Sequence, residues 1–292
     1  MLPTKSLIIT DLDNTLFDWV GIWHASFSAL LECLVAKTGL PRENLLDDIK
    51  IVHQQHGTSE YAFLIEEIKS LKVAYPNQDL VKVFDECIYA HRKARKAALE
   101  LYPTVRETLR MLKQKGCLIA SYTESMAFYT NYRIRNLNLD GLLDFIYSPA
   151  DHDLPKNLSP EQIRLFGEDH YKLVHAKHRY TPPGETKPNP DILRKILADV
   201  GANAEDAVYI GDSLMKDVAM AQTVGVADVH AAYGESKDRP EYPLLRRVTH
   251  WTTEDVERER NLTKRDIAPS YSLRDFGEIL SLFDFKKFES QR

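Results

Sequence analysis

The chain has 292 residues, which is longer than a usual single domain, and 43% of them are hydrophobic, enough to bury a core. Charged residues make up 28% of the chain. The formal net charge of −5 argues against a nucleic-acid polymer or an anionic membrane as the main partner. The composition therefore agrees with a soluble protein built from one large domain and an inserted or appended piece.

The cysteines and the apolar segments indicate the cellular compartment of the protein. Cys33, Cys87 and Cys117 are widely spaced and odd in number, which favours reduced thiols over a disulfide framework or a zinc site. We expect no apolar stretch long enough to span a bilayer. Lys5 leads directly into a predicted strand, without the long apolar region and cleavage site of a signal peptide. These features predict a cytoplasmic protein with no membrane partner.

The first predicted element is a buried strand at about 6–11, which leads into the sequence Asp11-Leu12-Asp13-Asn14-Thr15. In an extended chain, residues 11 and 13 lie on one side, so two carboxylates would meet where the strand leaves the sheet. Ligands of open α/β sheets bind at the carboxyl ends of the strands. Paired carboxylates there require a cation, because like charges at short distance shift each other's pKa. The simpler alternative is an acidic turn whose aspartates cap a helix.

The region 19–100 shows the spacing of apolar residues that is typical of helices, with breaks at 39–41 and 75–77. From residue 101 onward, helices alternate with strands. The predicted elements are a helix from about 101 to 116, a strand at 117–123, a helix at 190–200, a strand at 207–211, a helix at about 215–224 and a strand at 226–232. This order predicts an α/β fold with a mostly parallel, Rossmann-like sheet and an inserted all-helical domain.

Two segments fit this alternation less well. The stretch 149–186 is too long for an ordinary connection, and we expect a loop or short helix there. Its histidines, His170, His175 and His178, match no standard metal-ligand spacing. The C-terminal extension, about 234–292, is predicted to hold a helix at 253–261 and an amphipathic helix from 272 to 283 that packs on the sheet.

Four motifs occur in a fixed order: the Asp11-x-Asp13-x-Thr15 sequence, a strand ending at Thr123, Lys187 before a helix, and Gly211-Asp212 followed by Asp217. Together they resemble the haloacid dehalogenase-like (HAD) superfamily of phosphohydrolases. The resemblance implies that residues 1–18 and 101–292 form the α/β core. It also implies that residues 19–100 form the helical cap domain of such enzymes.

The same resemblance implies a phosphatase that hydrolyses a small phosphate monoester. Asp11 would be the nucleophile and form an aspartyl-phosphate. Asp13 would protonate the leaving oxygen and then deprotonate the attacking water. Thr123 would donate its hydroxyl to the phosphoryl group, and Lys187 would neutralise charge.

Mg²⁺ is the implied cofactor, since it prefers hard oxygen ligands. Its implied ligands are the Asp11 carboxylate, the Asp13 backbone carbonyl and the Asp212 carboxylate. Asp217 is counted with this metal site, with a role in orienting the metal shell or Lys187.

Several alternatives stay open at this stage. Ser121 is an alternative to Thr123 as the strand-end hydroxyl of the site. Lys187 could instead be an ordinary surface lysine. Glu124 stands where the family frequently has asparagine, and would disfavour extra anionic groups on a substrate if it faces inward. Asp13 argues against a dehalogenase, because a halide leaving group needs no proton. A phosphoglucomutase-type transferase and a non-catalytic ligand-binding protein remain as alternatives.

Specificity is expected to come from the cap, where Trp19, Trp23 and His24 follow the nucleophile loop. An aromatic pair there could stack a base or sugar, which makes the protein a nucleotidase candidate, although packing of both tryptophans at the junction of cap and core is the favoured alternative. We therefore expect a small phosphorylated metabolite as partner: a nucleoside monophosphate, or a sugar or organic acid phosphate. The sequence is compatible with a monomer or a homodimer.

Overall fold

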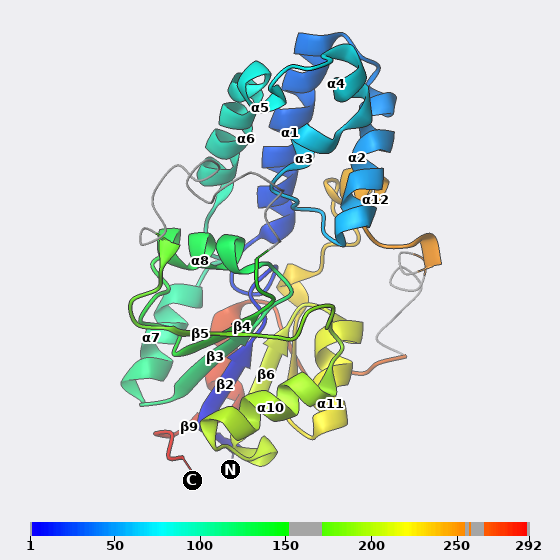
Figure 1. The fold of residues 1–292 in the computed structure, drawn as a ribbon. Helices are drawn as coiled ribbons and strands as arrows, with labels where there is room; N and C mark the ends of the chain where they lie inside the picture. Colours follow the sequence, from blue (N-terminus) through cyan, green and yellow to red (C-terminus); the bar gives the residue numbers. More distant parts are fainter. Residues whose placement is uncertain (1, 152–170, 255–256, 258–265, 291–292) are drawn as a thin grey trace. The chain divides into compact units, whose positions relative to one another are not determined.

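The computed structural model describes residues 2–151, 171–254, 257 and 266–290. The chain divides into two compact units (Figure 1). An α/β unit comprises Met1–Asp18, Glu100–Glu235 and Leu262–Arg292, and a helical unit comprises Trp19–Leu99 and Ser236–Asn261. Residues 236–261, which are predicted from the sequence to extend the core, group with the helices.

The α/β unit is built on a sheet in which every described strand pair is parallel. The strand order is β5-β4-β3-β2-β6-β7-β8. The strands are β2 (Leu7–Thr10), β3 (Leu118–Tyr122), β4 (Phe145–Ser148), β5 (Lys177–Tyr180), β6 (Ala207–Gly211), β7 (Ala227–Ala231) and β8 (Tyr271–Leu273). This sheet confirms the predicted Rossmann-like α/β class.

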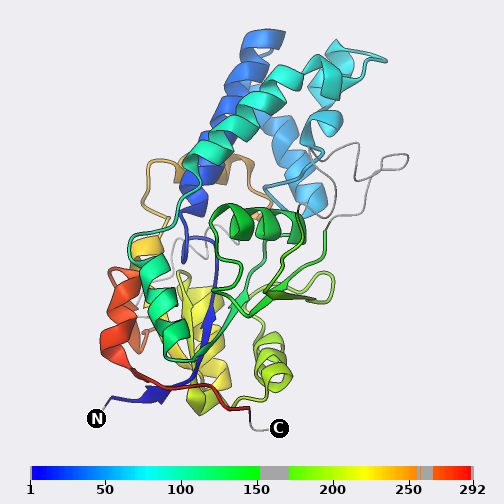
Figure 2. The ribbon, with the colours of Figure 1, turned by 90° about the vertical axis from the view of Figure 1, so that its left-hand side faces the viewer.

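Helices cover both faces of the sheet, as Figure 2 shows for α7 on one side and α10 on the other. The helices of this unit are α7 (Val105–Gln114), α8 (Ala127–Asn136), α10 (Pro190–Val200), α11 (Ala219–Val224) and the short α14 (Ile279–Leu282). One face of the core joins strand residues such as Ile9 and Ala120 to Leu193 and Ile196 of α10. These side chains are fully buried because parallel sheets are apolar on both faces.

Local sequence explains where α10 begins and ends. The Asn189 side chain accepts a hydrogen bond from the amide of Ile192 at 3.1 Å, and Pro190 occupies the first turn. Gly201 ends the helix in the left-handed conformation, with a φ of 72°. The cap at Asn189 fixes the preceding loop, which carries Lys187.

The C-terminal part of the chain corrects one prediction and qualifies another. The helix expected over 272–283 is wrong, since β8 takes the first residues, and a 3-10 turn at Phe276–Glu278 precedes α14. The strand has only three residues, so its alternation of buried and exposed positions cannot be distinguished from a helical pattern in the sequence. The helix expected at 253–261 lies largely outside the described residues. Near both termini, β1 (Thr4–Lys5) pairs in parallel with β9 (Asp284–Phe285).

The stretch 149–186 also departs from the expected loop or short helix, because β5 adds an edge strand to the sheet beside β4. In β5, the two ring nitrogens of His178 contact the Ser148 hydroxyl at 2.7 Å and the Asn131 side-chain oxygen at 2.9 Å. These contacts give His178 a structural role in the sheet edge. His170 lies outside the described residues.

The helical unit is organised around two long helices, α1 (Trp19–Thr38) and α6 (Asp85–Ala98), which pack against each other. Its other helices are α2 (Arg42–His56), α3 (Leu64–Glu67), α4 (Lys69–Ala74), α5 (Leu80–Val83) and α12 (Tyr242–Val248). α12 belongs here because Arg247 pairs with Asp47 at 2.6 Å and the Val248 carbonyl contacts His53 at 2.7 Å.

Trp23 is part of the core of this unit. Its side chain is only 3% exposed, its ring stacks on Phe27 with centroids 4.7 Å apart, and its indole nitrogen donates to the Ser59 carbonyl at 3.0 Å. A ring buried in this way is not available to stack a base. Trp23 therefore cannot be one of the two aromatic rings expected to stack a base or sugar.

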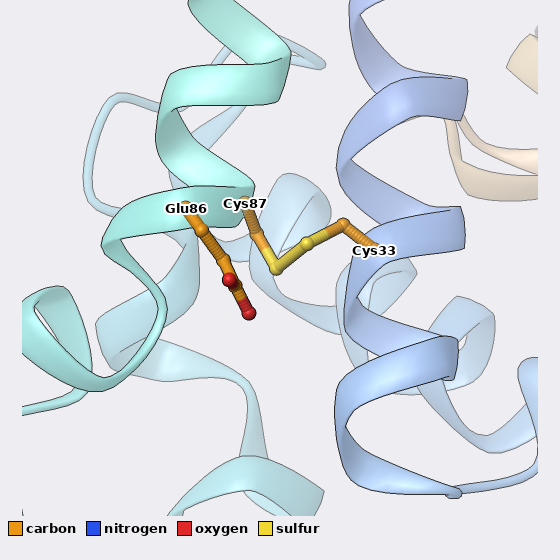
Figure 3. Close-up of side chains that lie close together, drawn as sticks. All are labelled: Cys33, Glu86 and Cys87. Carbon is orange, nitrogen blue, oxygen red and sulfur yellow. A yellow bond between two sulfur atoms is a disulfide. The ribbon is translucent and has the colours of Figure 1, made fainter.

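A disulfide between Cys33 and Cys87 joins α1 to α6 (Figure 3). The prediction of three reduced thiols is wrong for this pair, because the packing of the two helices brings together cysteines that are 54 residues apart in sequence. Cys117 is the cysteine outside a disulfide, and it is buried. The cysteine argument for a cytoplasmic protein therefore no longer holds.

The helix α1 has 20 residues and a mean hydropathy of 1.4 in its most apolar window. By length and composition alone it could cross a membrane, so the expectation that no stretch has these properties is wrong. Core helices of soluble proteins share them, and 44% of this window is buried inside the structure.

The disulfide should stabilise the helical unit. Replacing Cys33 and Cys87 with serine should lower the free energy of unfolding by about 2–4 kcal/mol, because the unfolded chain is no longer cross-linked. Thermal unfolding with and without reductant measures this effect. The Cys117→Ser variant should keep the wild-type response to reductant, and the double variant should lose it. An identical response in all three proteins would contradict the prediction.

Burial lowers the pKa of His53 to about 4 from its usual 6.5. Between these values the unfolded chain binds more protons at His53 than the folded protein does. The free energy of unfolding should therefore fall as the pH drops from about 6.5 toward 4. The variant His53→Asn does not titrate, so it should lose less stability over this interval, by on the order of 2 kcal/mol. Denaturant unfolding at pH 7 and pH 4.5 compares the two, and parallel losses would exclude His53 as the cause.

Candidate active site

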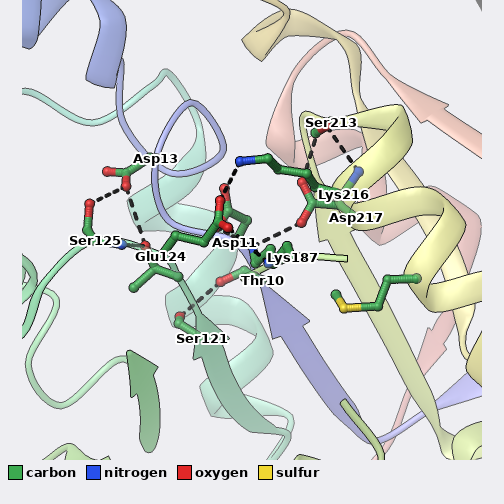
Figure 4. A network of polar contacts seen from close by, with 12 residues as sticks. Thr10, Asp11, Asp13, Ser121, Glu124, Ser125, Lys187, Ser213, Lys216 and Asp217 are labelled. Atoms are coloured by element: carbon green, nitrogen blue, oxygen red, sulfur yellow. Dashed lines mark hydrogen bonds and ion pairs between the residues drawn. The ribbon is translucent and has the colours of Figure 1, made fainter. Parts of the chain in front are cut away.

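The carboxyl ends of three neighbouring strands bring the predicted site residues together. β2 lies between β3 and β6, with Thr10 opposite both Ser121 and Ile210. The amide of Asp11 donates to the Ile210 carbonyl at 2.8 Å, so the chain is still held by the sheet at Asp11. Asp11 therefore lies between the residues that follow β3 and those that follow β6 (Figure 4).

Lys187 lies in the loop before α10, and its side chain binds the carboxylates of Asp11 and Asp217. Its ammonium donates to Asp11 Oδ1 at 2.6 Å and to Asp217 Oδ1 at 2.9 Å, and its side chain is only 3% exposed. Burial alone would lower the pKa of Lys187, but the two carboxylates outweigh it and hold the pKa well above its usual value. Lys187 is thus a buried, charged group of the site and not a surface lysine.

Asp217 is fixed from several sides. Its Oδ1 also accepts from the Tyr209 hydroxyl at 3.1 Å, and its Oδ2 accepts from the Ser213 amide at 3.1 Å. At Gly211, a Cβ would lie 2.3 Å from the Asp217 side chain, so only glycine allows this close approach. These contacts hold the Asp217 carboxylate beside the Lys187 ammonium.

Three carboxylates gather at one point: those of Asp11, Asp212 and Asp217, each with an oxygen within 4.8 Å of the others. Burial, opposed in part by Lys187, raises the pKa of Asp11 to about 7. Burial and the charges of Asp217 and Asp11 raise the pKa of Asp212 well above its usual value.

One ammonium does not balance three carboxylates, of which Asp11 and Asp217 are buried and Asp212 is half-buried, so this oxygen-rich cluster fits a hard divalent cation such as Mg²⁺. Both oxygens of Asp217 already accept hydrogen bonds. Asp11 and Asp212 are therefore the side chains best suited to hold the cation.

The Asp13 side chain belongs to a separate network. Its Oδ2 accepts from the Ser125 hydroxyl at 2.6 Å and from the Thr123 hydroxyl at 3.4 Å, and its Oδ1 accepts from Arg133 at 3.3 Å. The side chain is 20% exposed, so it is anchored in the protein while part of it faces outward. The prediction that Asp13 is a metal ligand therefore concerns only its backbone carbonyl.

The two strand-end hydroxyls have different positions. Ser121 is fully buried and shares a hydrogen bond with Thr10 at 3.0 Å, behind the strand ends. Thr123 contacts Asp13 and accepts from the Ser125 amide at 3.0 Å. Thr123 therefore lies at the site and Ser121 lies below it.

Glu124 lies beside Lys187 and is paired with Lys216. Its Oε1 accepts from the Lys187 amide at 2.9 Å, and its Oε2 accepts from the Lys216 ammonium at 2.5 Å. Burial would raise the pKa of Glu124, but the charge of Lys216 and these hydrogen bonds hold it below its usual value. The acidic residue that departs from the family pattern is thus compensated by a lysine.

Sequence reasoning missed four functional neighbours: Ser125, Arg133, Tyr209 and Lys216. An arginine among the apolar positions of the helix after the second strand was a usable signal for Arg133. Lys216 precedes Asp217 directly, but nothing in the sequence shows that it reaches Glu124. His175 is exposed in the described structure, away from these groups.

Comparisons with known proteins agree with this geometry. A family model described as haloacid dehalogenase-like hydrolase matches residues 5–225, and a second, HAD-hydrolase-like model matches residues 185–278. A glyceraldehyde 3-phosphate phosphatase from Methanopyrus kandleri is 22% identical over 79% of this chain and 85% of its own length. A phosphoglycolate phosphatase from Pasteurella multocida is 26% identical over 53% of this chain and 54% of its own length.

Among solved structures, a 2-haloacid dehalogenase from Pseudomonas syringae has a TM-score of 0.55 at 18% identity, covering 95% of this chain and 97% of its own. At this identity the likeness shows the fold alone. The first family model spans more than half of the chain and includes all four motifs. The chain therefore belongs to the haloacid dehalogenase-like hydrolases and is an enzyme.

Proposed function

We propose that this protein is a Mg²⁺-dependent phosphatase that hydrolyses a small phosphate monoester through an aspartyl-phosphate. The observation that carries the proposal is the buried ammonium of Lys187, 2.6 Å from the Asp11 carboxylate at the end of the central strand β2. The names of the two relatives, both phosphatases, support the same reaction class.

Asp11 is the nucleophile in this proposal. A carboxylate oxygen of Asp11 forms a bond to phosphorus while the bond from phosphorus to the ester oxygen breaks. A phosphate monoester repels an anionic nucleophile, so the attack requires positive charge nearby. Lys187 supplies one such charge and fixes the orientation of the Asp11 carboxylate.

Asp13 is the general acid and base. It protonates the ester oxygen as that oxygen leaves, and then takes a proton from the water that cleaves the aspartyl-phosphate. Asp13 follows the nucleophile by two residues, and hydrogen bonds from Ser125 and Thr123 hold its carboxylate. Both half-reactions therefore use the same carboxylate in opposite protonation states.

Asp11, Asp212 and the Asp13 backbone carbonyl would hold the cation. Bound there, it would supply Lewis-acid stabilisation of the charge on the phosphoryl oxygens. Asp217 acts through Lys187 and the Ser213 amide, since its oxygens are engaged by those groups.

The substrate class is a small phosphorylated metabolite. The Methanopyrus relative is named for glyceraldehyde 3-phosphate and the Pasteurella relative for phosphoglycolate. We therefore propose a short sugar or organic acid phosphate ahead of a nucleoside monophosphate, since Trp23 is buried. The mutase stays an alternative, and it would transfer the phosphoryl group instead of releasing phosphate.

Removing the nucleophile tests the reaction. Asp11→Asn should reduce phosphate release from p-nitrophenyl phosphate by on the order of 10⁴-fold or more, because an amide does not attack phosphorus. Asp13→Asn should reduce release from alkyl phosphates by roughly 10²- to 10⁴-fold. The assay uses a panel with glyceraldehyde 3-phosphate, phosphoglycolate and a nucleoside monophosphate, with Mg²⁺ or with EDTA.

The control is Asp191→Asn, which removes a carboxylate whose side chain is 91% exposed on the first turn of α10. It should keep wild-type rates. Near-normal rates in Asp11→Asn, or phosphate release that is equal with Mg²⁺ and with EDTA, would reject the proposed mechanism. Transfer to a second sugar phosphate without phosphate release would favour the mutase.

The ion pair of Glu124 and Lys216 should influence how well the site binds substrates that carry a second anionic group. Glu124→Gln removes the partner charge of Lys216, so a substrate with a second anionic group should bind better. The ratio of kcat/KM for phosphoglycolate to that for p-nitrophenyl phosphate should rise about three- to tenfold. Lys216→Met should lower the ratio, and the double variant should restore it. An unchanged ratio in both single variants would show that the pair has no influence on specificity.

A further inference from the structure

Arg133 is the largest fully buried side chain among the described residues. It lies on α8, and its side chain is only 1% exposed. Its Nη1 donates to Asp13 Oδ1 at 3.3 Å and to the Ser125 hydroxyl at 2.9 Å, while Ser125 donates to Asp13 Oδ2 at 2.6 Å. Two donors linked to each other therefore hold the two oxygens of one carboxylate.

Aromatic rings hold the guanidinium in place. Its central carbon lies 5.8 Å from the ring centroid of Phe17, which ends the nucleophile loop, and 5.6 Å from that of Tyr129 on α8. Ser125 is tied to the same helix, since the Thr130 hydroxyl donates to the Ser125 carbonyl at 2.9 Å. The network thus rests on groups that packing has already fixed.

Packing alone does not account for an arginine at this position. Burying a guanidinium is costly, and a hydrophobic side chain of similar volume usually packs as well as a buried ion pair. Arg133 also lies on the protein side of Asp13, because Asp13 is 20% exposed and Arg133 is 1% exposed. Within the described residues, Arg133 therefore lies behind Asp13 and forms its ion pair with the Asp13 carboxylate.

We propose that Arg133, acting directly and through Ser125, is a positioning residue that fixes the Asp13 carboxylate for proton transfer to the leaving oxygen. The inference rests on the proposed phosphatase function. The guanidinium of arginine has only hydrogen-bond donors. The Asp13 oxygen that it contacts must therefore accept, and this fixes the orientation of the carboxylate. Proton transfer requires the carboxyl group within hydrogen-bond reach of the leaving oxygen, so a rotated Asp13 would protonate it poorly.

The test compares two substrates of nearly the same shape, phenyl phosphate and p-nitrophenyl phosphate. Phenol is the poorer leaving group, so its departure depends more on protonation by Asp13. Arg133→Met should lose about tenfold more kcat/KM toward phenyl phosphate than toward p-nitrophenyl phosphate. Ser125→Ala should also lower kcat/KM more for phenyl phosphate than for p-nitrophenyl phosphate. Arg133→Lys should recover part of the kcat/KM that Arg133→Met loses toward phenyl phosphate.

The matched control is Arg135→Met, which removes an arginine from the same helix whose guanidinium contacts the Lys172 carbonyl. It should leave the ratio between the two substrates unchanged. If Arg133→Met does not fold, as judged by circular dichroism, Ser125→Ala and Arg133→Lys decide the test. Equal losses toward both substrates in the folded variants would overturn the positioning role. A wild-type protein that hydrolyses neither substrate would instead overturn the proposed function and the inference with it.

Discussion

The ion pairs of Lys187 with Asp11 and Asp217 join three segments that lie far apart in the sequence. Lys187 comes from the loop before α10, Asp11 from the end of β2 and Asp217 from the turn after β6. Without the ammonium, two buried carboxylates would face each other, and one of them would have to take up a proton. The arrangement of the strand ends therefore depends on a lysine that no strand carries.

This charge balance requires the backbone to approach closely at two glycines. Gly211 leaves room for Asp217, and Gly234 leaves room for the loop after Asp11, since a Cβ there would lie 1.8 Å from the Asn14 carbonyl oxygen. The neighbouring Tyr233 donates its hydroxyl to the Thr15 carbonyl at 2.6 Å. The loop that follows Asp11 is thus supported by the segment after β7, and the carboxylate cluster keeps its shape.

The sequence was sufficient to predict the parts of the site that depend on strand ends. In a parallel sheet all carboxyl ends meet at one edge, so Asp11, Thr123 and Asp212 had to lie near one another once their strands were identified. The direction of a long side chain from a loop or helix follows from packing that no local pattern encodes. That is why the lysine partner of Glu124 was missed and Arg133 was not considered.

The same limit explains the errors in the fold. Cys33 and Cys87 are paired because α1 and α6 pack side by side, and this contact was not visible in the cysteine spacing. The strand β8 has three residues and was absorbed into an apparent helical pattern. Residues 236–254 join the helical unit, where α12 contacts α2, and only the tertiary structure reveals this contact.

Most acidic groups of the site form an ion pair with a cation. Asp11 and Asp217 share Lys187. The other two pairs are Asp13 with Arg133 and Glu124 with Lys216.

Asp212 is the exception, since within the described ranges it forms no ion pair, and its pKa is raised well above its usual value by burial and by its acidic neighbours. A carboxylate in that position is costly to keep ionised unless a cation binds beside it. The distribution of charge therefore points to Asp212, more than to Asp217, as the acid that completes a cation site with Asp11.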